Sequence, residues 1–313
     1  MADLLLGVDG GGTKTVALVA DWEERVLGRG EGGPSNIYAA GKAVAYASLE
    51  KAIGEALSAA GVTPNDVVGV CLGLAGIGRP EDRALIERWV DAHFQGIPSC
   101  VVNDTQLVLT AGTPEGWGIA VVAGTGSHIY GQDPEGHTAR AGGWGYILGD
   151  EGSGYAIGLA GLRAVVRAVD RRDPPTMLTQ AILAHWGLGD LGELVQRVYD
   201  PAHGRLQIAE LSAVVQQCAL DGDAVARRIV AEAASELVVA VKAVIEQLAL
   251  TPPIPCALAG GAIVKGVALQ RAFVEQVRSL GLQLAPITPV PEPAMGALRI
   301  AKTCTERFRA ERR

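Results

Sequence analysis

The sequence predicts an α/β protein made of two duplicated domains that flank a ligand-binding cleft. The chain has 313 residues, which is more than one hydrophobic core commonly supports. Apolar runs over residues 4–9 and 117–123 are each followed by a glycine-rich turn and a second short strand. Residues 71–76 and 256–261 also resemble each other, since each run is an apolar strand that ends in small residues. Internal duplication explains both pairs most economically.

The boundary between the domains is expected near residues 113–116, where a proline and a glycine favour a turn. The N-terminal domain then covers residues 1–113 and the C-terminal domain residues 114–293. Residues 294–312 show helical spacing, and this helix could return to complete the first domain. Residues 154–250 are largely helical in their periodicity, so the second domain carries a helical insertion.

Apolar residues recur at the spacing of an amphipathic helix in several segments. In the first domain these segments are residues 41–60 and 80–95. In the second domain they are residues 154–169, 176–187, 207–221 and 223–250.

Composition and charge exclude several classes of protein. Hydrophobic residues make up 49% of the chain and charged residues 19%, with 41 glycines, which is typical of a globular α/β protein with many tight turns. A formal net charge of −7 argues against nucleic acid as a partner, because phosphate backbones are bound by basic surfaces. Prolines interrupt the uncharged run of residues 248–264, which therefore predicts no membrane span. Since no segment has the pattern of a signal peptide, we expect a cytoplasmic protein.

Five cysteines lie at positions 71, 100, 218, 256 and 304. None forms a Cys-x-x-Cys pair, and no spacing of cysteine and histidine suits zinc. Their odd number and their apolar surroundings predict buried free thiols in a reducing compartment.

The first glycine-rich turn has the composition of a phosphate-binding site. Asp9 ends an apolar strand, where an unpaired carboxylate is costly, so it is expected to face a metal, a phosphate or a network of water. A turn aspartate that binds backbone N–H groups is the alternative. Gly11 and Gly12 allow the backbone to approach a ligand closely, while Thr13 offers a hydroxyl and Lys14 a positive charge.

Two other nucleotide-binding motifs are excluded by spacing. Gly7 and Gly12 stand as in a Walker A loop, but Thr13 replaces the lysine, and a strand pattern over residues 15–19 follows where a helix is required. Residues 10–15 neither complete a Gly-x-Gly-x-x-Gly motif nor open a helix, which disfavours a dinucleotide site.

A second turn of the same kind occurs in the C-terminal domain. It holds Gly124, Thr125 and Gly126 between two short strands, so we expect it to bind phosphate as well. Gly260 and Gly261 follow a later strand, and they either open space for an adenine ring or only close a turn into a helix.

Asp104 follows the strand of residues 99–103 and precedes a helix that is expected to start near Thr105. One interpretation is a helix N-cap. The other is a general base, because a carboxylate at the end of a strand beside a cleft can accept the proton of an attacking hydroxyl. Phosphoryl transfer asks a protein mainly for positioning and charge neutralisation, so one aspartate, one metal ion and a phosphate-binding turn can suffice.

Residues 142–154 form the densest group of candidate ligand contacts. Six glycines in thirteen residues, with two adjacent acids and one tryptophan, indicate a loop that brings backbone and polar groups against a ligand. Asp150 and Glu151 could accept hydrogen bonds from sugar hydroxyls, although Asp150 could equally cap a helix that begins near Ser153. By spacing alone, Asn36 is a turn residue.

Taken together, these motifs resemble the actin and hexokinase superfamily, and within it the N-acetylglucosamine kinases and the BadF/BcrA-type ATPases. Residues 7–14 resemble the first phosphate motif, residues 103–104 the position of the catalytic aspartate, and residues 124–127 the second phosphate motif. Residues 142–153 resemble the most distinctive block of the N-acetylglucosamine kinases. The resemblance spans the chain and implies two ribonuclease-H-like domains that bind nucleotide and sugar in the cleft between them.

The resemblance also implies a role for each matched residue. Asp104 would contact the sugar and act as the base for its 6-hydroxyl, and Asp9 would order Mg²⁺ through water. Thr13 and Thr125 would hold the phosphates of ATP. The other nucleotide contacts would be Gly11, Gly12, Lys14, Gly124 and Gly126, with Gly260, Gly261 and, by a weaker match, Ala219 at the adenosine. The other sugar contacts would be Asn36, Gly143, Trp144, Gly145 and Asp150.

The function implied is ATP-dependent phosphorylation of an amino sugar, with N-acetylglucosamine converted to its 6-phosphate and a homodimer as the assembly. Nothing in the sequence separates this substrate from glucosamine, so glucosamine kinase stays open. An ATP-hydrolysing activator of a partner enzyme is a further alternative, but residues 142–154 lack the cysteine that ligates an iron–sulphur cluster in such activators. The last alternative is a sugar-binding protein that has no catalytic activity. A sugar-responsive repressor is disfavoured, since the zinc-bearing cysteine cluster of that related group is missing from the sequence.

Overall fold

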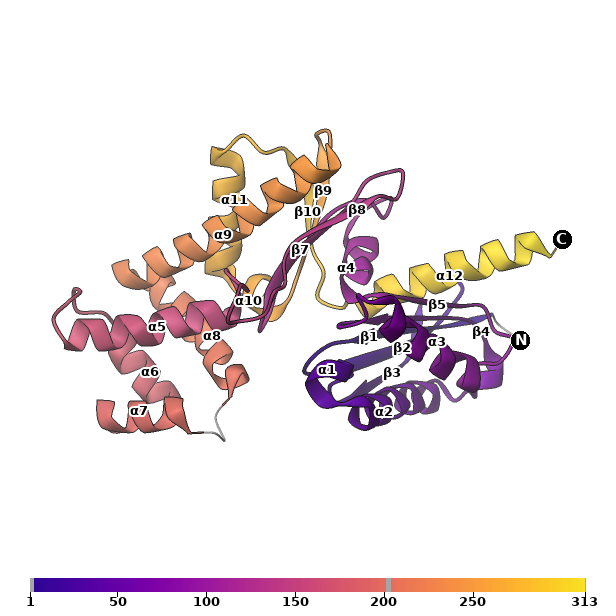
Figure 1. The fold of residues 1–313 in the computed structure, drawn as a ribbon, viewed down its shortest axis with the longest axis horizontal. Helices are drawn as coiled ribbons and strands as arrows, with labels where there is room; N and C mark the ends of the chain where they lie inside the picture. Colours follow the sequence, from indigo (N-terminus) through magenta and orange to yellow (C-terminus); the bar gives the residue numbers. More distant parts are fainter. Residues whose placement is uncertain (1–2, 201–203, 313) are drawn as a thin grey trace. The chain divides into compact units, whose positions relative to one another are not determined.

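The computed structural model describes residues 3–200 and 204–312. The chain divides into two compact units. Unit 1 combines the described residues of Met1–Gly116 and Glu292–Arg313, and unit 2 is formed by those of Trp117–Pro291. Each unit contains one five-stranded mixed sheet with helices packed against it (Figure 1). The predicted α/β fold class is therefore confirmed.

The sheet of unit 1 has the strand order β3-β2-β1-β4-β5. Strands β1, β4 and β5 run parallel, whereas β1 pairs antiparallel with β2, and β2 with β3. The carboxyl ends of the three parallel strands therefore lie at one edge of the sheet. The strands are β1 (Leu4–Gly10), β2 (Thr15–Asp21), β3 (Val26–Gly32), β4 (Val67–Leu74) and β5 (Ser99–Asn103).

The sheet of unit 2 repeats this plan in the order β10-β9-β6-β7-β8. Strand β6 pairs parallel with β9 and antiparallel with β7, as β1 pairs with β4 and β2. The duplication expected from the two hairpins and the two glycine-ended strands is thus visible in the topology. The strands are β6 (Gly118–Ala123), β7 (Ser127–Gln132), β8 (Thr138–Gly142), β9 (Ile254–Ala259) and β10 (Leu284–Pro289).

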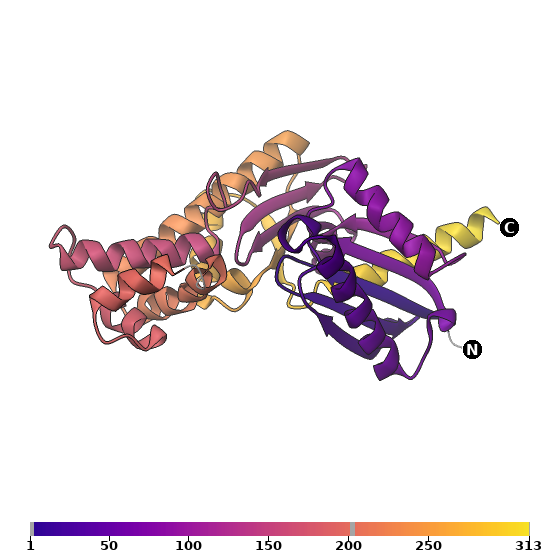
Figure 2. The ribbon, with the colours of Figure 1, turned by 60° about the horizontal axis from the view of Figure 1, so that its bottom comes forward.

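Side chains of β1 alternate between two hydrophobic cores, because the central sheet of unit 1 is covered on both faces. Leu6 and Val8 pack in the core that contains α2 and α3, while Leu5 packs in the core that contains α4 and α12. Figure 1 and Figure 2 show α12, the last helix of the chain, beside the first strands. The helices of unit 1 are α1 (Ile37–Ala40), α2 (Lys42–Ala60), α3 (Pro80–His93), α4 (Asp104–Gly112) and α12 (Ala294–Glu311), with the short 3₁₀ helix η1 (Pro64–Asp66).

Helix α2 lies unusually close to strand β3. Three alternate residues of β3 are glycines, and a Cβ atom on any of them would collide with a backbone carbonyl oxygen of α2. These glycines and the carbonyls that they face are Gly28 with Ala56, Gly30 with Ala52, and Gly32 with Ser48. The glycines of this strand therefore serve packing rather than ligand binding.

Unit 2 carries most of the helices. The periodicity predicted α5 (Gly154–Val169), α6 (Leu178–Trp186), α8 (Arg205–Leu220) and α9 (Ala224–Leu248) to within a few residues. It missed α7 (Leu191–Tyr199) and α11 (Val267–Ser279), and it also missed the one-turn helix α10 (Gly261–Val264).

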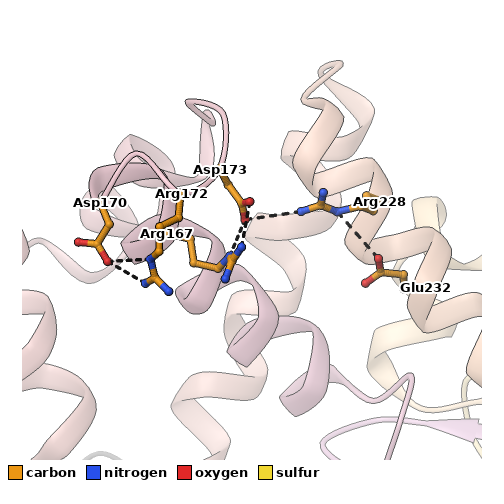
Figure 3. Close-up of polar contacts among 6 residues, drawn as sticks. All are labelled: Arg167, Asp170, Arg172, Asp173, Arg228 and Glu232. Atoms are coloured by element: carbon orange, nitrogen blue, oxygen red, sulfur yellow. Dashed lines mark hydrogen bonds and ion pairs between the residues drawn. The ribbon is translucent and has the colours of Figure 1, made fainter.

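The turn after α5 is fixed by ion pairs that involve α9 (Figure 3). Arg167 Nε donates to Asp173 Oδ2 over 2.6 Å, and Arg228 Nη2 lies 3.9 Å from the same oxygen. A second pair joins Arg172 Nη2 to Asp170 Oδ2 over 2.7 Å. The hydrogen bond from Arg167 holds the pKa of Asp173 below its ordinary value, so this carboxylate is charged at neutral pH.

The prediction of five free thiols is wrong for two cysteines. Cys100 in β5 and Cys304 in α12 form a disulfide, whereas Cys71, Cys218 and Cys256 are free and buried. Burial raises the pKa of the Cys71 and Cys256 thiols, because an apolar interior disfavours the thiolate. The pair was not predictable from spacing, since 204 residues separate its members and only the packing of α12 on the sheet brings them together.

Within residues 3–200 and 204–312, every helix is too short or too polar to span a bilayer.

Candidate functional site

The first glycine-rich turn joins β1 to β2 in unit 1. Gly11 N–H donates to the carbonyl oxygen of Lys14 over 2.9 Å, which closes the turn. Gly12, Thr13 and Lys14 are exposed, and a Cβ atom on Gly12 would meet no other atom within 4 Å. The tip of this turn, at Gly12, is therefore open, and turns of this kind can form concave sites for anions.

The segment before α1 packs on the same turn. The carbonyl oxygen of Gly11 accepts hydrogen bonds from the N–H groups of Ser35, at 3.0 Å, and Asn36, at 3.2 Å. Ser35 is buried, and its Oγ has no hydrogen-bond partner among the described residues. These hydrogen bonds, which no sequence pattern indicated, place Asn36 beside the first glycine-rich turn.

Asn36 is the N-cap of α1. Its Oδ1 accepts hydrogen bonds from the N–H groups of Tyr38, at 3.0 Å, and Ala39, at 3.2 Å. Gly76 lies directly against this amide, since a Cβ atom there would be 2.8 Å from Asn36 Oδ1. The turn role that spacing predicts for Asn36 is therefore confirmed, and its amide is fixed in orientation.

Asp9 and Asp104 are at the carboxyl-terminal edge of the parallel strands of unit 1. Asp9 is in β1 next to the turn, and Asp104 directly follows β5. Burial, followed by the negative charges of Asp104 and Glu292, raises the pKa of Asp9 to about 7, and Lys14 opposes this shift. The edge is thus a site of concentrated negative charge that a cation would stabilise.

The orientation of Asp104 is set by the start of α4. Asn103 is the N-cap of this helix and accepts a hydrogen bond from Thr105 N–H over 3.1 Å, so the interpretation of Asp104 as the N-cap is wrong. Asp104 is the first helical residue, and its Oδ1 accepts from the same N–H over 2.9 Å. At the other end of α4, Arg299 of α12 donates to the carbonyl oxygens of Thr110 and Ala111, so α12 supports the helix that carries Asp104.

The second glycine-rich turn, between β6 and β7, is bonded to the start of α5 in unit 2. Gly154 N–H donates to the carbonyl oxygen of Gly124 over 2.8 Å. Ser127 Oγ donates to the carbonyl oxygen of Glu151 over 2.6 Å, and Gly143 N–H donates to the carbonyl oxygen of Ser127 over 3.1 Å. The turn and the glycine-rich block of residues 142–154 therefore form one structure, although the sequence presents them as separate motifs.

The tip of this block exposes apolar side chains. Trp144 lies between two glycines with positive φ, 73° at Gly143 and 85° at Gly145, and 65% of its surface is exposed. The guanidinium of Arg140 packs on its ring, with Cζ 5.1 Å from the ring centroid. Such a flat, exposed aromatic surface is suited to a sugar ring or an acetyl group.

Asp150 is buried and does not cap α5. Ser153 is the N-cap, since its Oγ accepts from Ala156 N–H over 3.1 Å. Asp150 has a φ of 62°, which is unusual for a residue other than glycine, and its Oδ2 accepts a hydrogen bond from Arg205 Nη2 over 2.8 Å. Arg205, the first residue of α8, is a residue that sequence reasoning missed, because a lone arginine at a helix start has no distinguishing pattern.

The third glycine-rich segment packs on the second turn. A Cβ atom on Gly260, whose φ is 93°, would collide with the carbonyl oxygen of Ala123, whereas one on Gly261 would meet no atom within 4 Å. Ala219 is buried in α8, and its carbonyl oxygen accepts a hydrogen bond from Arg227 Nε over 3.0 Å. Unit 2 therefore brings Gly260 directly against the second glycine-rich turn, while Ala219 lies within the helical part.

Gln216, also in α8, connects this helix to the glycine segment. Its Nε2 donates to the carbonyl oxygen of Ala262 over 2.9 Å, and its Oε1 accepts from Leu269 N–H over 3.0 Å. Gln216 is buried, so these bonds have little competition from water. Sequence reasoning missed this residue too, because a glutamine in a helix is ordinarily a surface residue.

Comparison with known proteins identifies the family of the chain and several sugar-kinase relatives. The family model of the BadF/BadG/BcrA/BcrD ATPase family matches residues 6–301. The chain is 37% identical over 260 residues to an N-acetylmuramic acid/N-acetylglucosamine kinase of Clostridium acetobutylicum, which covers 83% of this chain and 85% of that protein. It is 31% identical over 311 residues to an N-acetyl-D-glucosamine kinase of Dictyostelium discoideum, covering 96% of this chain and 98% of that protein.

A solved structure has a similar fold. The fold is similar to that of a candidate N-acetylglucosamine kinase from Chromobacterium violaceum, with a TM-score of 0.77 and 27% sequence identity. The similarity covers 96% of this chain and 99% of that one.

Proposed function

Because this chain belongs to the BadF/BadG/BcrA/BcrD ATPase family, we propose that it is an ATP-dependent kinase of amino sugars, with N-acetylglucosamine as the leading substrate. The observation that carries the proposal is the position of Asp104, which follows β5 at the sheet edge that also bears Asp9. A base next to a phosphate-binding turn is what phosphoryl transfer to a hydroxyl requires. The names of the two relatives support the same reaction.

Asp104 acts as the general base in this proposal. The oxygen of the sugar 6-hydroxyl forms a bond to the γ-phosphorus of ATP while the bond from that phosphorus to the bridging oxygen breaks and ADP leaves. The proton of the hydroxyl passes to the Asp104 carboxylate. The hydrogen bond from Thr105 N–H to Asp104 Oδ1 supports this role, because it holds one carboxylate oxygen in place and so fixes the orientation of the carboxylate.

The phosphates of ATP are held by the two glycine-rich turns. The exposed backbone of Gly12, with Gly11 beside it, the Thr13 hydroxyl and the Lys14 charge serve this purpose in unit 1. Gly124, Thr125 and Gly126 serve it in unit 2. At the nucleoside end we assign Gly260 and Gly261, with Ala219 in the helix that Gln216 connects to the same segment.

The residues around Asp9 fit Mg²⁺. No three or more His, Cys, Asp or Glu side chains within residues 3–200 and 204–312 gather to enclose a metal ion, but Mg²⁺ commonly uses one or two carboxylates together with phosphates and water. The raised pKa of Asp9, caused by burial and then by Asp104 and Glu292, supports a bound cation, which would relieve this repulsion. When bound, Mg²⁺ would neutralise charge on the phosphates.

The sugar is assigned to polar groups in both units. In unit 1 these are Asn36, whose Oδ1 is engaged in capping so that its Nδ2 is the group that would donate to a sugar oxygen, and Asp104 itself. In unit 2 they are Gly143, Trp144, Gly145 and Asp150. The exposed ring of Trp144 supports a substrate with an apolar substituent, such as the acetyl group.

Titration calorimetry with N-acetylglucosamine and glucosamine separates the two amino sugars. We expect tighter binding of N-acetylglucosamine. Residues 142–154 contain two acidic side chains, and Asp150 is already paired with Arg205, so only Glu151 is left to meet an ammonium group. Tighter binding of glucosamine would make glucosamine kinase the better assignment. Equal ADP release from ATP with and without any sugar would instead favour an ATPase that activates a partner enzyme.

We also propose a cytoplasmic location, where ATP is abundant, and a homodimer. Light scattering at several protein concentrations tests the assembly directly.

A further inference from the structure

The ion pair of Arg205 and Asp150 rests on the second phosphate turn. Arg205 Nη2 lies 2.8 Å from Asp150 Oδ2, and only 5% of the Asp150 side chain is exposed. A Cβ atom on Gly126 would lie 2.7 Å from Arg205 Nη2 and 2.8 Å from Asp150 Oδ2. The pair therefore touches the backbone of the turn itself, and only glycine leaves room for it.

The guanidinium of Arg205 retains donor capacity beyond this pair. Arginine has five N–H donors. Its Nε is buried, and no acceptor among the described residues lies within hydrogen-bonding distance of it. The guanidinium also packs on Tyr146, with Cζ 5.2 Å from the ring centroid, while 37% of the side chain is open to solvent. Arg205 is thus held in one orientation at a site that a ligand can reach.

Asp150 adopts a strained backbone conformation to make this contact. Its φ of 62° is a conformation that residues other than glycine rarely adopt, and its carbonyl oxygen accepts a hydrogen bond from Ser153 N–H over 3.1 Å. Strain of this kind persists where the surrounding structure over-determines it, which is frequent in functional sites.

The order of contacts along the turn indicates which part of the nucleotide Arg205 faces. Gly260, assigned to the adenosine, packs against Ala123 and Gly124 at the start of the turn. Arg205 lies at Gly126, farther along, and Gly143, which is assigned to the sugar, donates its N–H to the carbonyl oxygen of Ser127. Arg205 is therefore at the end of the turn toward the sugar, where the terminal phosphate has to lie.

We propose that Arg205 binds the terminal phosphoryl group of ATP and stabilises the charge that develops on it during transfer, and that Asp150 positions the guanidinium on the turn. A guanidinium suits this task because it can bind two phosphate oxygens at once. The inference rests on the proposed function, since it takes ATP as the phosphoryl donor. It adds a catalytic arginine to a site for which the motifs supply only backbone, hydroxyls and one lysine.

The Arg167–Asp173 pair is a matched control. It belongs to the same unit and has a comparable distance of 2.6 Å. It lies at the far end of α5, whose 16 residues span roughly 24 Å. Loss of this pair removes an ion pair without touching the phosphate turn.

The test compares Arg205→Gln and Arg205→Lys with Arg167→Gln. Calorimetry without sugar measures the binding of ADP and of a non-hydrolysable ATP analogue, and steady-state kinetics give kcat and each KM. We expect Arg205→Gln to weaken analogue binding at least tenfold, since a charge-assisted hydrogen bond is lost, but to change ADP binding less than threefold. We expect kcat to fall roughly 10²-fold, with partial recovery in Arg205→Lys and no change in Arg167→Gln. Asp150→Asn should also weaken analogue binding without sugar, which a residue that contacts only the sugar cannot do.

Three results would overturn the proposal. The first is Arg205→Gln with wild-type binding of the analogue, the second an equal loss of ADP and analogue, and the third a change confined to the KM for the sugar. A wild-type protein that phosphorylates no sugar would remove the proposed function, yet the comparison of ADP with the analogue would still decide the role of Arg205. Thermal unfolding confirms that each variant is folded.

Discussion

Asp9 and Asp104 lie at the same edge of the unit 1 sheet. Burial and then the charge of Asp104 raise the pKa of the Asp9 carboxyl to about 7. Glu292 adds to this shift, and Lys14 opposes it. Repulsion between the two carboxylates destabilises the unliganded protein. If Mg²⁺ binds here as proposed, it would also stabilise the folded protein.

Asp9→Asn is expected to stabilise the metal-free protein at neutral and alkaline pH. The folded pKa of about 7 lies above the ordinary value of 3.8, so within this window the unfolded chain has lost a proton that the folded chain keeps. Ionisation then favours the unfolded state, and the wild type loses stability as the pH rises from roughly 4 to 7. Thermal unfolding in a chelating buffer should give equal Tm values below this window and a higher Tm for the variant above it.

Asp66→Asn is the control for the direction of this effect, because the pKa of Asp66 is shifted the opposite way. Hydrogen bonds from the backbone and then the side chain of Thr63 lower the pKa of Asp66, so its stabilising effect is present at neutral pH and is lost as the pH falls. This variant should unfold earlier than the wild type at pH 8. An Asp9→Asn variant that also unfolds earlier at pH 8 would show that Asp9 is not under the repulsion described.

Gln216→Leu is expected to raise the KM for ATP. The change leaves the carbonyl oxygen of Ala262 and the N–H of Leu269 buried without partners, at a cost of about 1–3 kcal/mol for each group, so the glycine segment that we assign to the adenosine shifts. We expect the KM for ATP to rise roughly tenfold, with the KM for the sugar nearly unchanged. Steady-state kinetics measure both.

Gln217→Leu is the matched control for this change. Gln217 is the next residue of α8, but it is exposed and binds Asp221 of its own helix turn over 2.9 Å. Its variant should keep both KM values. If Gln216→Leu raises only the KM for the sugar, the assignment of the glycine segment to the nucleotide fails.

The disulfide between Cys100 and Cys304 is expected to stabilise unit 1. It joins β5 to α12 across 204 residues, so it restricts the unfolded chain strongly, by roughly 3–5 kcal/mol. Reductant should lower the Tm of the wild type but not that of Cys304→Ser, which should already unfold earlier. Titration of thiols in denaturant without reductant should find the three free cysteines; five would contradict the pairing.

The sequence was informative where a motif combines several rare features. Alternating apolar strands with glycine turns predicted the two hairpins, because such turns tolerate few other residues. The block of residues 142–154 was predicted to be a ligand loop, and in the structure it is bonded to the second turn through Ser127 and Gly143. The duplicated strand order follows from the same local patterns.

Residues that act through tertiary contacts were not predictable in the same way. Arg205 and Gln216 lie in a helix whose pattern distinguishes neither of them, and only the packing of α8 brings them to Gly126 and Ala262. Cys100 and Cys304 meet for the same reason. Asp104 was placed correctly at a helix start, but the N-cap of that helix is the neighbouring Asn103. Local patterns do not separate two adjacent residues that can both cap a helix.

The most direct test of the central claim is ADP release from Mg-ATP with N-acetylglucosamine, measured for the wild type, Asp104→Asn and Asp173→Asn. Asp104→Asn keeps the size of the side chain but removes the base, so kcat should fall by about 10²–10⁴-fold with both KM values nearly retained. Asp173→Asn, which removes the charge that pairs with Arg167 and Arg228 (Figure 3), should retain wild-type kcat. Sugar-dependent turnover in the wild type that survives in Asp104→Asn would contradict the assignment of Asp104 as the base, and its absence from the wild type would contradict the kinase itself.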